Sequence, residues 1–252
     1  MPEQLWVTQI LNHVFGPFVT SLLQAIGIHP EHPEAPIHNA FAMEFVVFLF
    51  LLTLFLIVRS QLSVEKPGPL QHTVEGIVGF VEQQSREIIG PHSESFTPFL
   101  VALGLFILGC NLIGMIPGFE SPTAVPIVPL GCAVVAFVYY QAQGFKHSGA
   151  KYLAHFAGPS DPSMPLLIRL PLAMLMVPIE LISHLARVLS LTIRLFANMF
   201  AGDMVTLVFF SLVPIGIPIA FLGLHLGVSL LQTYIFVLLT TVYLSDAVAG
   251  EH

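Results

Sequence analysis

Long apolar runs separated by short polar segments dominate this chain. A helix needs about 20 mainly apolar residues to cross a bilayer. The runs predict an all-α polytopic membrane protein with about five spans, of which the last two are long and tilted. The predicted spans are 41–58, 96–116, 125–143, 179–213 and 219–244. We expect residues 41–252 to form a single transmembrane domain, preceded by an outer, interfacial N-terminal segment, 1–40.

The fourth apolar stretch, 165–213, is too long for an upright span. As a helix it would extend about 73 Å, against a hydrocarbon core of about 30 Å. Either it crosses twice, or one part lies at the interface while the rest crosses at a steep tilt. Pro171 and Pro178 interrupt its first part, and proline disfavours a helix interior. We favour one crossing, over 179–213, with 165–178 near the interface.

Two further segments have the pattern of surface helices. Between residues 74 and 89, apolar side chains recur on one helical stripe and Glu, Gln and Arg fill the other faces. This predicts an amphipathic helix on the inner membrane surface. The apolar stretch Leu5–Ile26 is broken at Gly16-Pro17, and we expect it at the outer interface.

Composition and charge agree with a membrane protein. Apolar residues make up 55% of the chain and charged residues 9%, with a net charge of −7. A soluble domain carries about 25% charged residues, and a nucleic-acid partner would call for a basic surface. Lys and Arg occur in alternate loops, which places the N-terminus outside and the C-terminus in the cytoplasm. Cys110 and Cys132 lie in apolar runs and are expected to be buried thiols, not a disulfide.

Charged and polar residues inside the last two spans are the candidates for chemistry. Arg194 has apolar neighbours on both sides, and an arginine at mid-membrane is costly and usually functional. Glu180 shares a helical stripe with Arg194 but lies toward the inner end of the helix, too far along the axis for an ion pair. Asp203 lies about 180° round the helix from Arg194, so this acid is also out of ion-pair reach. In the last span His225, Ser229 and Gln232 form a second stripe. If these helices form an antiparallel hairpin, Asp203 meets His225 and the two make a plausible proton relay.

Each of these residues also has a structural interpretation. Arg194 could tie backbone carbonyls together, Arg169 and Arg187 could snorkel to the interface, and Asn111, His225 and Gln232 could join helices by hydrogen bonds. A metal site at His29, His32 and His38 is not favoured, because no helix holds these side chains together. No Gly-rich phosphate loop occurs. No metal, cofactor or nucleotide is therefore predicted.

A cation fixed in the membrane without a partner in its own chain calls for an anion on another subunit. Such an arginine would attract a partner carboxylate and block direct passage of a proton from one side to the other. A stand-alone secondary transporter is the main alternative, although it would normally show internal repeats, and no repeat is seen. A structural membrane subunit without an ion path is the third possibility.

Three sequence runs resemble subunit a of the F-type ATP synthase membrane sector. They are 189–202 (LSLTIRLFANMFAG), 231–244 (LQTYIFVLLTTVYL) and 111–118 (NLIGMIPG). The resemblance covers residues from about Phe96 to the C-terminus. It implies a stator in a bacterial plasma membrane that faces a rotating ring of c subunits, is held by peripheral-stalk b subunits and passes protons.

The resemblance also implies roles for individual residues. Arg194 matches the essential arginine that faces the ring carboxylate. The matches to the outer half-channel are Asn198, Asp203, His225, Gln232 and Asn111, and those to the inner half-channel are Glu180 and Ser190. At Asp203 the family often has Glu or His, so this chain departs from the pattern but keeps a titratable group. Catalysis of ATP formation would belong to other chains of the complex.

Overall fold

The computed structural model describes residues 4–25, 27, 35–63, 67–116, 118–149, 166–212 and 217–248, and every regular element in them is helical. The α-helices are α1 (Trp6–Ala25), α2 (Asn39–Ser60), α3 (Pro69–Ile89), α4 (Thr97–Ile113), α5 (Ile127–Ser148), α7 (Leu166–Leu212) and α8 (Ile217–Val248). Two short 3-10 helices, η1 (Pro91–Ser95) and η2 (Pro122–Ala124), precede α4 and α5. The predicted all-α class is confirmed.

Within the described part of the chain, four helices are long and apolar enough to cross a membrane, and α4 is a shorter apolar helix. The four are α2, α5, α7 and α8. The 17 residues of α4 extend about 26 Å, slightly less than the hydrocarbon core. These five helices correspond to the five predicted runs.

Helix α7 continues without interruption through Pro171 and Pro178. Its 47 residues would extend about 70 Å. Because no turn divides the helix, it cannot cross a bilayer twice. The interpretation with two crossings is therefore wrong, whereas the position of 165–178 at an interface remains a prediction.

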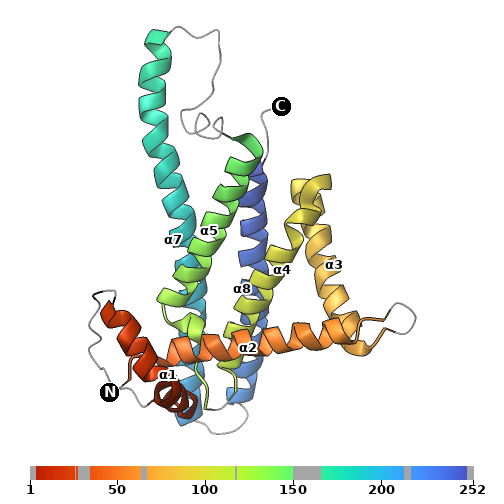
Figure 1. Ribbon diagram of the computed structural model, residues 1–252, viewed down its shortest axis with the longest axis vertical. Coiled ribbons are helices and arrows are strands. Elements are labelled where there is room, and N and C mark those ends of the chain that lie inside the picture. Colours follow the sequence, from red (N-terminus) through yellow and green to blue (C-terminus); the bar gives the residue numbers. More distant parts are fainter. Residues whose placement is uncertain are drawn as a thin grey trace.

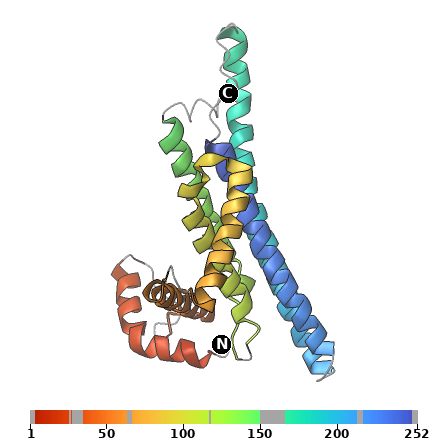
Figure 2. The same ribbon diagram turned by 90° about the vertical axis from the view of Figure 1, so that its right-hand side faces the viewer.

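Helix α2 runs across the direction shared by α7 and α8 (Figures 1 and 2). All three helices are apolar enough to lie within a bilayer. If α2 stands along the membrane normal, then α7 and α8 must be steeply tilted. Such a tilt also accommodates their length, since the 32 residues of α8 extend about 48 Å.

The main core lies where α4, α5, α7 and α8 pack together. Leu195 and Met199 of α7 meet Ile107 of α4, Ala136 of α5 and Phe236 of α8. Glycines let the helices approach closely: a Cβ added at Gly104 would lie 2.9 Å from Val237 Cγ2, and one at Gly109 would lie 2.7 Å from Val47 Cγ1. Small residues at contacts are typical of membrane helix packing. Cys110 and Cys132 are free and buried, as predicted.

The two predicted surface segments are both helices. Helix α1 contains Pro17 in its interior and is visibly bent (Figure 2), so the predicted break at Gly16-Pro17 is wrong: the chain bends there without leaving the helix. A proline can kink a helix in this way. Helix α3 begins with Pro69 at its first turn, a favoured position for proline. It packs against α8, where the rings of Phe80 and Tyr234 lie with centroids 5.9 Å apart and planes tilted by 45°.

Candidate functional site

Arg194 lies on α7 with one hydrogen-bond partner among the described residues. Its Nη2 donates to Ser190 Oγ at 3.2 Å, one helical turn away. No ion pair to Arg194 occurs within the described part of the chain, and the side chain is partly exposed. The expectation that Glu180 and Asp203 lie beyond ion-pair reach agrees with this arrangement. Within the described residues, the guanidinium therefore has no counter-charge.

One turn further along α7, Asn198 joins α7 to α8. Asn198 Nδ2 donates to Gln232 Oε1 at 2.8 Å, and Gln232 is buried. Asn198 lies four residues after Arg194 on α7. Its hydrogen bond to Gln232 joins the polar stripe of α8 to the polar stripe of α7. The resemblance implies a place for Gln232 in the outer half-channel, and in the structure its amide oxygen accepts a hydrogen bond from Asn198.

Asp203 and His225 face each other nearer the end of the α7–α8 pair. His225 Nε2 lies 3.7 Å from Asp203 Oδ1. This separation allows electrostatic pairing but is longer than a direct hydrogen bond. His225 is buried, and its Nε2 makes no hydrogen bond to the described residues. The antiparallel hairpin expected from the sequence thus brings together an acid and an imidazole.

Gly202 makes this arrangement possible. A Cβ built at Gly202 would lie 2.5 Å from His225 Nδ1 and 3.0 Å from Cε1. Any larger residue would displace the imidazole ring, because real Cβ atoms do not approach so closely. The glycine beside Asp203 is therefore part of the site, although only its place in the 189–202 run marked it in the sequence.

Asn111 is a fully buried connection between α4, η2 and α8. Its Nδ2 donates to Thr233 Oγ1 at 3.3 Å and to Ser229 O at 3.4 Å, and its Oδ1 accepts from Thr123 Oγ1 at 2.7 Å. Ser121 Oγ continues the network at 3.0 Å from Thr123 Oγ1. These contacts agree with the interpretation of Asn111 as a residue that joins helices. They also place it against α8 between His225 and Gln232.

The opposite half of α7 holds a second polar cluster around Glu180. His184 Nε2 lies 3.4 Å from Glu180 Oε1, and His184 Nδ1 lies 3.2 Å from the Tyr140 hydroxyl. His184 and Tyr140 are buried. The i,i+4 spacing of Glu180 and His184 was visible in the sequence, but nothing in it pointed to Tyr140 on α5. Ser190, predicted on the same inner side, contacts Arg194 and not this cluster.

Arg187 contacts two side chains of α8. Its Nη2 lies 3.3 Å from Asp246 Oδ2, and its guanidinium carbon lies 4.8 Å from the centre of the Tyr243 ring. The snorkelling interpretation of Arg187 stays a prediction, to which the structure adds the contacts with Asp246 and Tyr243. The partner in the ion pair, Asp246, was not among the residues predicted from the sequence.

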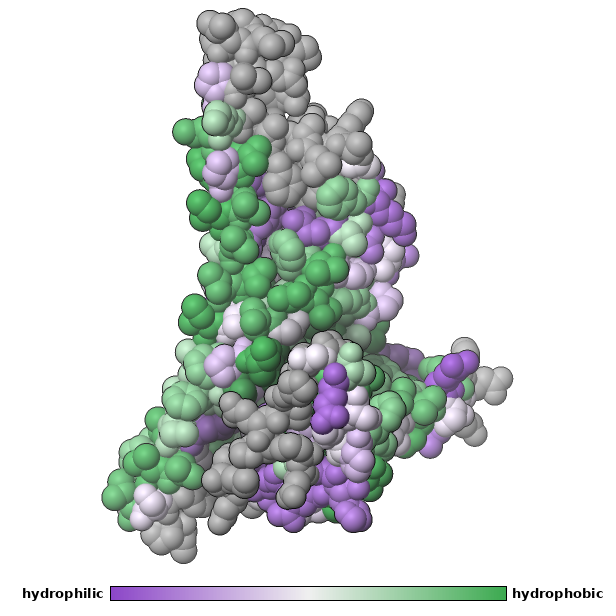
Figure 3. All heavy atoms as spheres, turned by 60° about the vertical axis from the view of Figure 1, so that its left-hand side comes forward, coloured by the Kyte–Doolittle hydropathy of each residue, from purple (hydrophilic) through white to green (hydrophobic). Residues whose placement is uncertain are grey.

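One side of α7, about 100–180° round the helix from Arg194, is largely apolar and uncovered. Figure 3 shows a continuous hydrophobic surface along this helix. Leu185, Leu189 and Ile193 are exposed by 57%, 54% and 59%. A surface of this size on a membrane helix is covered by lipid or by another protein.

Comparison with known proteins decides the family. The family described as ATP synthase A chain matches residues 41–245. The chain belongs to this family. An ATP synthase subunit a of Koribacter versatilis is 51% identical over the full length of both chains. A subunit a of Solibacter usitatus is 50% identical over 92% of this chain and 95% of its own, and one of Geobacter sp. strain M21 is 36% identical over 95% and 98%.

Family membership has direct consequences for the chain. It is a multi-pass membrane subunit of a bacterial ATP synthase, takes part in proton transport, and is not itself the catalytic subunit. The alternative of a stand-alone secondary transporter is thereby overturned. Among the described residues no group of three or more His, Cys, Asp or Glu could hold a metal ion; His29 and His32 lie outside those residues.

Proposed function

We propose that this ATP synthase subunit a is the stator wall of the proton path, with Arg194 as its charge barrier. A ring of c subunits would turn against the exposed face of α7, and peripheral-stalk b subunits would hold the chain in place. One observation carries the proposal: Arg194 is partly exposed on α7 and has no ion-pair partner among the described residues.

The unpaired arginine would act on carboxylates carried by the ring. A carboxylate that loses its proton is attracted to Arg194, because the interaction of opposite charges is strong where little water is present. A protonated carboxylate is neutral and can move on into lipid. The same positive charge repels a proton in transit, so that a proton cannot pass straight from one side of the membrane to the other.

Two polar paths would bring protons to and from the ring. On the outer side the path comprises Asp203 of α7 and His225 of α8. Three amides continue this path beside α8: Asn198 of α7, Gln232 of α8 and Asn111 of α4. On the inner side Glu180 is the entry group, and we add its neighbour His184 because the two side chains lie 3.4 Å apart. Because the two paths do not meet, each proton must be carried from one to the other on a ring carboxylate. Each elementary charge that crosses 100 mV supplies about 2.3 kcal/mol.

The proposal is tested by ATP-driven proton pumping in vesicles that contain the assembled complex. Replacement Arg194→Ala should abolish coupled pumping, because nothing then holds the ionised ring carboxylate or blocks a leak. Arg59→Ala is the matched control: Arg59 is an exposed arginine at the end of α2 and its loss should leave pumping intact. Assembly is verified in both variants. Normal coupled pumping by Arg194→Ala would contradict the proposal and leave a structural subunit as the explanation.

A further inference from the structure

Arg187 occupies a position on α7 between Glu180 and Arg194. The three residues follow one another at steps of seven, and each step is about 10.5 Å along the helix axis and about 20° round it. A proton that leaves a ring carboxylate near Arg194 for Glu180 must therefore pass Arg187. This step rests on the proposed function, in which Glu180 belongs to the inner path.

An unpaired positive charge at Arg187 would oppose the passage of protons. Arg194 is proposed to stop protons by the same kind of charge, so a second unpaired arginine on this stripe would place a barrier inside the inner path. Only 25% of the Arg187 side-chain surface is accessible, and charges repel more strongly where little water is present. An open inner path therefore requires a counter-charge at Arg187, whereas the barrier at Arg194 requires that none be present.

Asp246, near the end of α8, supplies a counter-charge at Arg187. Its Oδ2 lies 3.3 Å from Arg187 Nη2. Tyr243, three residues earlier on α8, lies with its ring centre 4.8 Å from the guanidinium carbon. Within the described part of the chain, Asp246 is the one acid that forms an ion pair with Arg187.

The ion pair lies next to the groups that would carry protons on the inner side. His184 is three residues before Arg187 on α7, and the charges of Arg187, Glu180 and Asp246 all act on it. The ring of Tyr243 also lies 6.0 Å from the ring of Tyr140, centroid to centroid. The charge balance at Arg187 is therefore felt where a proton on the inner path would be held.

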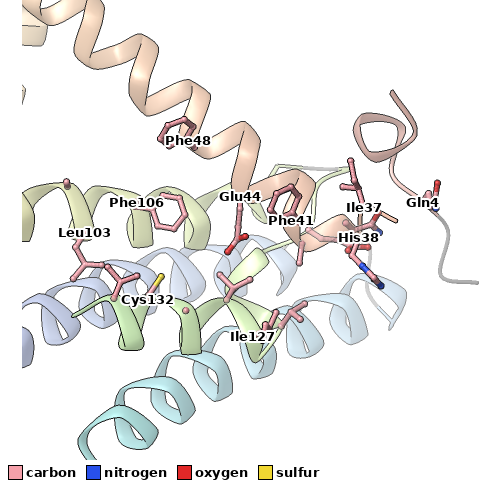
Figure 4. A pocket seen from close by; sticks show the side chains of 18 of the residues that line it. Gln4, Ile37, His38, Phe41, Glu44, Phe48, Leu103, Phe106, Ile127 and Cys132 are labelled. Carbon is pink, nitrogen blue, oxygen red and sulfur yellow. Dashed lines mark hydrogen bonds between the residues drawn. The ribbon is translucent and has the colours of Figure 1, made fainter. Parts of the chain in front are cut away.

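The other carboxylates that face the interior of the chain do not reach Arg187. Glu44 projects into a cavity of about 1280 Å³ between α2, α4 and α5, and Glu120 lines the same cavity (Figure 4). Among the described residues, none that lines this cavity belongs to α7 or α8. Neither acid can therefore replace Asp246 as the partner of Arg187.

From this arrangement we infer that Asp246 keeps the inner proton path open by neutralising Arg187. Asp246 is a positioning residue: it acts through Arg187 and carries no proton itself. The accessible part of its side chain is 54%, so the ion pair contributes little to stability, and its role is to balance charge. Loss of the acid alone is then harmful, whereas loss of both partners is not.

ATP-driven proton pumping in vesicles with the assembled complex tests this charge logic. In Asp246→Asn we expect pumping to fall at least about threefold, because an unpaired charge about 10 Å away opposes each proton. Arg187→Gln and the double variant Asp246→Asn/Arg187→Gln should pump nearly like the wild type, as should Asp246→Glu. Glu94→Gln is the matched control, since it removes an acid 3.1 Å from another arginine, Arg86, outside the α7–α8 pair.

A second variant changes the charge after the complex has assembled. Asp246→Cys can be labelled in the vesicles with a thiol reagent that carries either a sulfonate or an ammonium group of similar size. The sulfonate should restore pumping and the ammonium should lower it further. Cys110 and Cys132 of this chain are buried, and the same reagents on the wild-type complex are the control. Because labelling follows assembly, this comparison decides even when Asp246→Asn assembles poorly.

Three outcomes would overturn the inference. They are wild-type pumping in Asp246→Asn, a double variant as slow as Asp246→Asn, and equal effects of the two thiol reagents. A purely structural ion pair would give the second outcome, because removal of Arg187 as well could not restore a lost contact. If Arg194→Ala abolishes pumping while Asp246→Asn pumps normally, the proposed function stands and this inference fails. Normal coupled pumping in Arg194→Ala would instead contradict the proposed function.

Discussion

Two arginines one heptad apart on α7 have opposite environments. Arg187 lies 3.3 Å from Asp246 and over the ring of Tyr243, whereas Arg194 contacts only the hydroxyl of Ser190 among the described residues. Both project from nearly the same side of one helix. The difference is the neighbouring helix, since α8 offers an acid and an aromatic ring at Arg187 and an amide, Gln232, near Arg194. An arginine in a membrane helix is therefore available to another subunit only where its own chain offers no counter-charge.

The largest effect should come from giving Arg194 a partner of its own. In Ser190→Asp a carboxylate replaces the hydroxyl that now accepts the hydrogen bond at 3.2 Å. Two opposite charges about 4 Å apart attract by about 4 kcal/mol near a protein surface, so Arg194 should become as neutralised as Arg187. ATP-driven pumping should fall at least about tenfold in assembled vesicles. Ser190→Ala, the control, should retain most of the activity; equal losses in the two variants would point to the hydroxyl itself.

The next largest effect should come from Gly202→Ala. The added Cβ would lie 2.5 Å from His225 Nδ1, so the imidazole must move away from Asp203. Overpacking of this kind costs about 1–3 kcal/mol, and pumping should fall several-fold while Arg194 is unchanged. Gly223→Ala on α8 is the control, because a Cβ there meets no atom within 4 Å. Wild-type pumping and stability in Gly202→Ala would show that the ring position is not critical.

A smaller effect is expected from Tyr140→Phe, beside the cluster that contains Glu180. The change removes the hydroxyl that lies 3.2 Å from His184 Nδ1. An unsatisfied buried polar atom costs about 1–3 kcal/mol. Thermal release of the subunit from the detergent-solubilised complex should therefore occur at a lower temperature. Tyr139→Phe on the same helix serves as the control, and an equal shift in both variants would argue against a specific role for the hydrogen bond to His184.

The smallest effect should come from Arg187→Gln. Asp246 is about half exposed, with 54% of its side-chain surface accessible, and exposed ion pairs contribute about 0–1 kcal/mol. The contact with Tyr243 adds a similar amount. The release temperature should fall slightly and coupled pumping should remain. Loss of pumping in this variant as complete as in Arg194→Ala would remove the distinction between the two arginines.

Much of the helical layout could be read from local patterns. Apolar runs located α2, α4, α5, α7 and α8, because the bilayer requires about the same length from any spanning helix. Helix ends and breaks were less predictable, because Pro17, Pro171 and Pro178 lie inside helices. Helix packing outweighs the local cost of proline, and an apolar medium offers the backbone no hydrogen-bond partner outside the helix.

The candidate site was only partly predictable. Helix geometry separated Arg194 from Glu180 by distance along the axis and from Asp203 by rotation about it. The hairpin with α8 brought Asp203 to His225. Tyr140, Asp246 and Thr123 were not predicted, because each contact depends on which helices become neighbours. The tight approach of Gly202 to His225 was likewise invisible in the spacing of residues.

Sequence alone therefore predicted the class of protein, the order of its apolar helices and its family, since these depend on local hydropathy and on motifs. The tertiary structure decided which charges are neutralised, which glycines are needed for close contact, and where a cavity remains beside α2. The physical reason is range: hydropathy and helix periodicity act over a few turns, whereas ion pairs, ring contacts and cavities depend on how residues far apart in the chain pack together.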